Sequence, residues 1–127
     1  MRILLDTHTL LWYLEGSTKL SQTARSVIEN KENNCYISMI SFWEIAIKLS
    51  IGKLKLKSTI DDLKKKVEAS GISILMLEFE HIAIITTIPF HHRDPFDRQL
   101  VAICLYEKMT LVSRDENFKL YGVDVKW

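Results

Sequence analysis

The chain has 127 residues, of which 47% are hydrophobic and 26% charged, which is the balance of one globular domain. The formal net charge of +1 excludes a strong overall field for nucleic acid, so phosphate contacts would have to come from local basic residues. No apolar stretch reaches the roughly 18 residues that span a bilayer, and the N-terminal apolar run is too short for a signal peptide. With only Cys35 and Cys104 and no CxxC spacing, we expect a cytoplasmic protein with buried free thiols.

The first half of the chain alternates short apolar runs with amphipathic segments. The predicted elements are a strand over 2–5, a helix over 9–14, a helix over 20–31, a strand over 35–38 and a helix over 41–51. Gly16, Asn33 and Gly52 interrupt this series. The last helix is apolar on two sides and must bury both, so we expect it to need a partner besides the sheet.

The second half continues the alternation. The predicted elements are a helix near 59–70, a strand over 72–75, a helix over 78–88 stopped by Pro89, a helix over 95–108, a strand over 110–113, a short turn or helix from Asp115 and an edge strand over 123–127. Strands alternate with helices throughout. This order favours a single α/β domain with a mainly parallel central sheet of four to five strands flanked by helices.

Four carboxylates each lie where an apolar run meets a new helix: Asp6, Glu44, Asp97 and Asp115. In an open parallel sheet, ligands bind outside the carboxyl ends of the strands. Carboxylates gathered there would repel one another unless a cation lay between them, and such hard oxygen ligands favour Mg²⁺ or Mn²⁺. The pattern therefore indicates a metal-dependent phosphodiesterase.

Each acid also has a purely structural interpretation. Glu44 follows Ser41 by three residues, the spacing of a capping box, and precedes Lys48 by four, the spacing of a helical ion pair. Asp6 and Asp115 have the position of simple helix caps.

Asp97 shifts the balance towards a site. It follows Asp94 by three residues with a proline between them, as an acid in the first helical turn does. It also shares a helix face with Leu100, Val101 and Cys104, which must pack inward. An unpaired charge at the edge of a core is costly, so a purely structural role explains it poorly.

With these residues in place, the chain resembles a PIN domain, specifically a VapC-type toxin ribonuclease of toxin–antitoxin systems. The segments that carry the resemblance are LLDTHTLLWYL, ISMISFWEIAIKLSIGKLKL, HHRDPFDRQLVAICL and LVSRDENFKLYGV. They occur in order and span essentially the whole chain. The resemblance therefore implies one PIN domain over residues 1–127.

The resemblance also implies roles for the acids. Asp6, Glu44, Asp97 and Asp115 would bind Mg²⁺, for which Mn²⁺ would substitute, or orient a metal-bound water that cleaves RNA. Ser113 occupies the place of a small hydroxyl residue often found two positions before the last acid. The further candidates are Asp94 and Ser113 in an outer shell, and His92, Arg93 and Arg98 as RNA contacts. Whether one or two ions bind, and whether Asp94 is a cap or an outer-shell ligand, stays open.

Two other functions remain alternatives. A phosphatase of the DxD kind is disfavoured because Asp6-Thr7-His8 lacks the second aspartate. A non-catalytic α/β protein-binding module is the main alternative, with its acids serving only as helix caps. Convergence of the four acids in space would separate the nuclease from the binding module.

The resemblance implies two protein partners, a cognate antitoxin and a second copy of the chain. Trp43 and Ile47 lie off the main apolar stripe of the 41–51 helix, and Trp12 adds a large ring in a neighbouring segment. Exposed aromatic patches usually mark interfaces. We therefore expect a homodimer and an antitoxin contact lined by Trp12, Trp43 or Ile47, and no membrane association.

Overall fold

Five parallel strands form the centre of the molecule in the computed structural model, which describes all residues from Met1 to Trp127. The strand order is β3-β2-β1-β4-β5, and every neighbouring pair is parallel. The strands are β1 (Arg2–Leu5), β2 (Asn34–Ser38), β3 (Ser73–Leu75), β4 (Thr110–Val112) and β5 (Val125–Lys126). The predicted α/β fold is confirmed, and β5 lies at an edge as expected.

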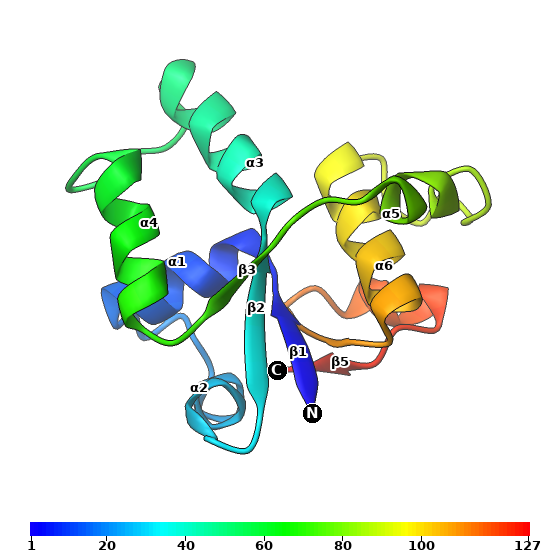
Figure 1. Cartoon of the computed structure of the whole chain (residues 1–127), viewed down its shortest axis with the longest axis horizontal. Helices are drawn as coiled ribbons and strands as arrows, with labels where there is room; N and C mark the ends of the chain where they lie inside the picture. The colour runs from blue at the N-terminus through cyan, green and yellow to red at the C-terminus, as the bar shows by residue number, and fades with distance from the viewer.

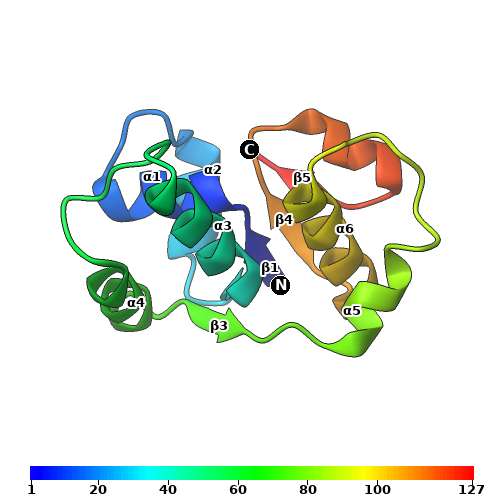
Figure 2. The same cartoon turned by 90° about the horizontal axis from the view of Figure 1, so that it is seen from above.

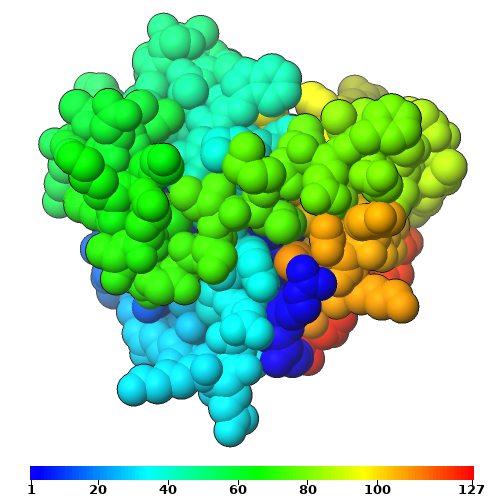
Figure 3. All heavy atoms as spheres, in the orientation of Figure 1, coloured from blue at the N-terminus to red at the C-terminus, as the bar shows by residue number.

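Helices cover both faces of this sheet. They are α1 (Thr7–Glu15), α2 (Gln22–Glu29), α3 (Met39–Ser50), α4 (Ile60–Ala69), α5 (Phe79–Ile84), α6 (Pro95–Glu107) and the 3₁₀ helix η1 (Glu116–Tyr121). Helices α1, α2 and α4 lie on one side, and α5 and α6 on the other (Figures 1 and 2). The chain around β3 crosses from the α4 side to the α5 side (Figure 3). No helix has the length and apolar character of a membrane span.

The alternation of side chains along β1 explains the two layers of helices. Successive residues of a strand point to opposite faces. Ile3 and Leu5 join one buried cluster with residues of α1, α2, α3 and α4, whereas Leu4 joins a second cluster with residues of α6 and η1. The three buried residues of this central parallel strand, Ile3, Leu4 and Leu5, are therefore all apolar. Both cysteines are buried and free, as predicted.

Several helix boundaries differ from the predicted ones: α1 begins at Thr7 rather than at residue 9, and α2 spans Gln22–Glu29 rather than residues 20–31. The start of α3 and the end of α5 have identifiable physical causes. Helix α3 begins at Met39, because the Ser38 hydroxyl at the end of β2 accepts the Ile40 N–H at 3.1 Å. The predicted capping box of Ser41 and Glu44 is therefore wrong, and Glu44 lies inside the helix. Helix α5 ends at Ile84, and residues 85–87 form turns with hydrogen bonds from residue i+3 to residue i. Pro89 disfavours helical backbone in the residue before it, so the helix does not reach residue 88.

Candidate metal centre

The topology creates a crevice between β1 and β4. The chain runs outward from β1 to β2 and β3, then returns to β4 on the other side of β1. Connections from these neighbouring strands therefore leave in opposite directions, and such a switch point is where open α/β sheets bind ligands. Leu5 pairs with Val112 at the ends of the two strands, so the next residues, Asp6 and Ser113, emerge together at this edge.

A pocket of about 180 Å³ opens at this edge. Its lining residues are Asp6, Thr7, His8, Glu44, Lys48, Asp94, Asp97, Asp115 and Phe118. All four acids singled out in the sequence line this one pocket, together with Asp94. Lys48 is the only lysine or arginine among the lining residues. The arrangement is therefore strongly acidic, although the whole chain is nearly neutral.

Ser113 connects two of the acids. Its hydroxyl donates to Asp6 Oδ2 at 2.5 Å and accepts the Asp115 N–H at 3.1 Å. The other oxygen of Asp6 accepts the Thr9 N–H at 2.8 Å, which caps α1. Asp6 is thus a helix cap and also one wall of the pocket. These hydrogen bonds of Ser113 join the end of β1 to the residues that follow β4, and Ser113 itself is fully buried.

Glu44 is held from two directions. Thr7 Oγ1 donates to Glu44 Oε1 at 2.6 Å and lies 2.9 Å from the Ser41 hydroxyl. Lys48 Nζ lies 2.9 Å from Glu44 Oε2, which confirms the predicted i,i+4 pair. Sequence reasoning did not identify Thr7 as part of the site. A hydroxyl residue directly after a strand-ending acid was the available signal, but such residues are common.

Asp97 differs from the other acids. Its carboxylate accepts no hydrogen bond from the protein, and it lies partly buried in the first turn of α6. Burial, followed by the nearby charge of Asp94, raises the pKa of Asp97 from 3.8 to about 7, and the charges of Glu44 and Asp6 act in the same direction. Desolvation and like charges both disfavour an ionised carboxyl group. A negative charge here is unfavourable unless a cation offsets it.

Asp94 has a structural role and also faces the pocket. Its Oδ1 accepts the Phe96 N–H at 2.7 Å and the Asp97 N–H at 3.3 Å, so it caps α6. Pro95 follows at the first helical position, the pattern expected from the sequence. The capping role is therefore present. An outer-shell role remains compatible with it, because the second carboxylate oxygen makes no hydrogen bond to the protein.

The three residues suggested as RNA contacts occupy different environments. Arg93 is exposed. Arg98 is only 5% exposed, and its guanidinium donates to the Pro89 and Ile85 carbonyls at 2.7 and 3.2 Å while lying over the Phe90 ring. We therefore assign Arg98 to holding the loop before α6. The His92 side chain is directed to Asp115, with Nε2 2.8 Å from Asp115 Oδ2.

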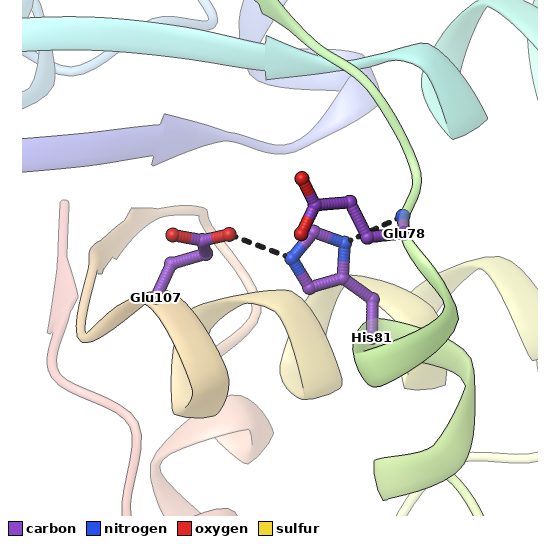
Figure 4. Close-up of side chains that lie close together, drawn as sticks. All are labelled: Glu78, His81 and Glu107. Carbon is purple, nitrogen blue, oxygen red and sulfur yellow. Dashed lines mark hydrogen bonds and ion pairs between the residues drawn. The ribbon is translucent and has the colours of Figure 1, made fainter.

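A second group of potential ligands lies elsewhere in the molecule. Nitrogen and oxygen atoms of Glu78, His81 and Glu107 lie within 4.8 Å of one another (Figure 4). Glu107 and Asp97 are ten residues apart on α6, which is about 15 Å along a helix. This group therefore lies well away from the acidic pocket.

The buried ring of His81 has no lone pair left for a metal ion. Its Nδ1 accepts the Glu78 N–H at 3.0 Å, and its Nε2 lies 2.8 Å from Glu107 Oε1 (Figure 4). Arg2 pairs with the other Glu107 oxygen at 3.3 Å. The hydrogen bond from His81, followed by that from Arg2, lowers the pKa of Glu107. We interpret this group as a structural link between β1, α5 and α6.

Comparison with known proteins agrees with this architecture. The PIN domain family matches residues 3–123. VapBC2 from Rickettsia felis, bound to promoter DNA, aligns with a TM-score of 0.68 and 16% identity over 99% of this chain and 98% of that chain. VapBC-1 from Haemophilus influenzae aligns with a TM-score of 0.69 and 14% identity over 99% of this chain and 97% of that chain.

A third structure, FitAcB from Neisseria gonorrhoeae, gives a TM-score of 0.62 and 20% identity over 97% of this chain and 95% of that chain. No curated protein matches the chain significantly in sequence. Identities this low establish the fold alone. The match over residues 3–123, together with the switch-point pocket described above, shows that the chain belongs to the PIN domain family.

Proposed function

We propose that this protein is a Mg²⁺-dependent endoribonuclease toxin whose activity is neutralised by a cognate antitoxin. PIN domains are typically nucleases, and the chain resembles VapC-type toxins over its whole length. The pocket suits a divalent cation, because four carboxylate residues, Asp6, Glu44, Asp97 and Asp115, are among those that line it. Mn²⁺ has the same preference for oxygen ligands and is expected to substitute.

The environment of Asp97 is the observation that carries this proposal. Asp6, Asp94 and Asp115 each accept helix N–H groups, so their presence alone fits a protein whose acids are only caps. Asp97 has no such role. Burial and the surrounding carboxylates raise its pKa to about 7, a cost that a structural protein has no reason to retain. A bound cation would remove that cost.

The chain's own residues would prepare the site for phosphodiester hydrolysis. When bound, the ion would lower the pKa of a water and offset charge developing on the phosphate. Ser113 fixes Asp6, and Thr7 and Lys48 fix Glu44, so these carboxylates are held in place before substrate arrives. The exposed Arg93 and Arg114 lie next in sequence to pocket acids and supply positive charge for RNA phosphates.

The test is cleavage of a mixed RNA pool by Asp6→Asn. Asparagine still accepts the Thr9 N–H, so the helix cap and the fold are retained while one negative charge is removed. We expect activity to fall by at least the roughly 10–100-fold that loss of an outer-shell partner of a metal ligand costs, because Asp6 would contact the ion directly. The control is Asp61→Asn, an exposed acid on α4. Full activity in Asp6→Asn, with an unchanged melting curve, would exclude the ligand role.

The choice of RNA as substrate has its own test. Single-stranded RNA and DNA of the same sequence are incubated with wild-type protein and Mg²⁺, with EDTA as control. We expect cleavage of the RNA only, and none in EDTA. Equal cleavage of DNA would contradict the ribonuclease proposal but leave the metal centre intact. No cleavage and no metal binding would favour the binding-module alternative.

A further inference from the structure

His92 contacts two residues that line the acidic pocket, Asp115 and Phe118. It belongs to the loop between α5 and α6, yet its side chain is only 9% exposed. Its ring is stacked on Phe118, with centroids 4.5 Å apart and planes 18° apart, and lies nearly parallel to Tyr121 at 5.5 Å. Both aromatic partners belong to η1. The ring is therefore packed in a fixed orientation and has little surface left for RNA.

A chain of hydrogen bonds determines what this ring does. The His91 N–H donates to the Tyr121 hydroxyl at 3.0 Å, and that hydroxyl lies 3.1 Å from His92 Nδ1. His92 Nε2 lies 2.8 Å from Asp115 Oδ2. If Tyr121 donates to Nδ1, the ring donates from Nε2 to Asp115. This order is that of a neutral imidazole with its proton on Nε2.

Asp115 needs such a partner more than the other acids do. Its side chain is 41% exposed, and the residue caps a short 3₁₀ helix. Packing therefore does little to orient the carboxylate, and its hydrogen bonds must do so. Oδ1 accepts the Asn117 N–H at 2.9 Å and Oδ2 accepts from His92. Each oxygen accepts one hydrogen bond and keeps lone-pair capacity for a cation.

We propose that His92 is a positioning residue that holds the Asp115 carboxylate in the orientation needed to bind the metal ion. This inference rests on the proposed metal-dependent function. Partners that orient metal ligands typically contribute 10–100-fold in metal affinity. His92 acts through Asp115 and is not itself a contact to RNA. The stack with Phe118 and Tyr121 supplies the rigidity that an exposed loop would otherwise lack.

Three variants separate orientation from packing. His92→Phe keeps an aromatic ring for the stack but has no donor. His92→Met fills the same space without a donor and replaces His92→Phe if that variant does not fold. His92→Gln loses the ring but keeps an N–H donor for Asp115. The measurements are the rise in melting temperature across a Mn²⁺ titration and the Mn²⁺ concentration that gives half-maximal RNA cleavage.

We expect His92→Phe to need roughly 10–100-fold more Mn²⁺ in both measurements, and His92→Gln to return towards wild type even if its metal-free melting temperature is lower. A purely structural role would lower the metal-free melting temperature and leave both Mn²⁺ titrations unchanged. That result, or a His92→Gln protein with the same Mn²⁺ requirement as His92→Phe, would overturn the proposal.

Wild-type protein and Asp97→Asn distinguish this failure from failure of the proposed function. If Mn²⁺ does not raise the melting temperature of the wild type, the metal centre itself is wrong. If Mn²⁺ stabilises the wild type and Asp97→Asn reduces that effect, while His92→Phe behaves like wild type, only the role of His92 is wrong.

Discussion

At the scale of single residues, Asp97 shows how a functional charge costs stability. Its pKa is raised from 3.8 to about 7 in the folded protein by burial, then by Asp94. Between those pH values the folded state keeps a proton that the unfolded state has released. Stability therefore decreases as pH rises from about 4 to 7, and the full cost is present above pH 7.

Asp97→Asn should remove this cost in metal-free protein. The carboxylate accepts no hydrogen bond from the protein, so asparagine loses only the charge. In EDTA we expect the variant to melt higher than wild type by on the order of 5 °C at pH 8, and no difference at pH 4. Melting curves from pH 4 to 8 measure this, with Asp61→Asn as the control. A pH-independent difference would show that charge is not the cause.

The roles of individual residues were predictable to different degrees. Asp6, Asp97 and Asp115 could be found because each lies directly at a helix start, a local signal within a few residues. Glu44 was found from a helix start placed at Ser41, whereas the structure places Glu44 inside α3.

The link between His92 and Asp115 could not be found from such a local signal, because it spans 23 residues and depends on stacking against η1. The Arg98 contacts with the Ile85 and Pro89 carbonyls were hidden for the same reason, since they depend on how the preceding loop folds back.

At the scale of elements, the contacts of Glu107 join three parts of the fold. Arg2 of β1 and His81 of α5 both meet Glu107 at the end of α6. Because these partners lower the pKa of Glu107, its ionised form stabilises the folded state. That contribution is present above the ordinary pKa of 4.5 and is lost as pH falls through the lower folded value.

We expect Glu107→Gln to lower the melting temperature by a few degrees at pH 7, because breaking a buried contact of this kind leaves His81 poorly paired. The difference should shrink as pH falls below about 4.5. The matched control is Glu29→Gln, whose ion pair with Arg25 is a surface i,i+4 pair of small value. If both variants melt alike, Glu107 does not link these elements.

Element boundaries followed the sequence where a strong local signal existed. Gly16 adopts a left-handed conformation with φ of 64° and ends α1, as its position indicated. The start of α3 was predicted at residue 41, because Ser41 and Glu44 have the spacing of a capping box, but the helix begins at Met39 with Ser38 as its cap. The parallel sheet decided in favour of Ser38, because pairing of β2 with β3 continues to that residue and the helix begins directly after it.

At the scale of the whole molecule, exposed aromatic surface lies close to the acidic pocket. Trp43 on α3 is 60% exposed and contacts Phe96 at the start of α6, the same helix that carries Asp97. Trp12 is less exposed, because it is half-buried and its ring packs against Trp127. Trp43 is therefore the stronger candidate for a partner contact. A protein seated on it would lie beside the mouth of the site.

We expect Trp43→Ala to weaken binding of the antitoxin encoded next to this gene by at least about tenfold, as loss of an aromatic interface residue does. The matched control is Phe79→Ala, which removes a ring that is 78% exposed on α5. Binding is measured by calorimetry on folded variants. The molar mass of the wild-type protein in solution, measured by light scattering, tests the expected homodimer. Equal loss in both variants, or none in either, would place the contact elsewhere.

The central claim is that the carboxylates at the switch point bind a divalent cation. A crystal structure of the protein soaked in Mn²⁺, with anomalous data, tests it directly. We expect Mn²⁺ in the pocket, with oxygens of Asp6 and Asp97 among its ligands at about 2.0–2.6 Å. An empty pocket at millimolar Mn²⁺, or Mn²⁺ only at Glu78, His81 and Glu107, would contradict the claim.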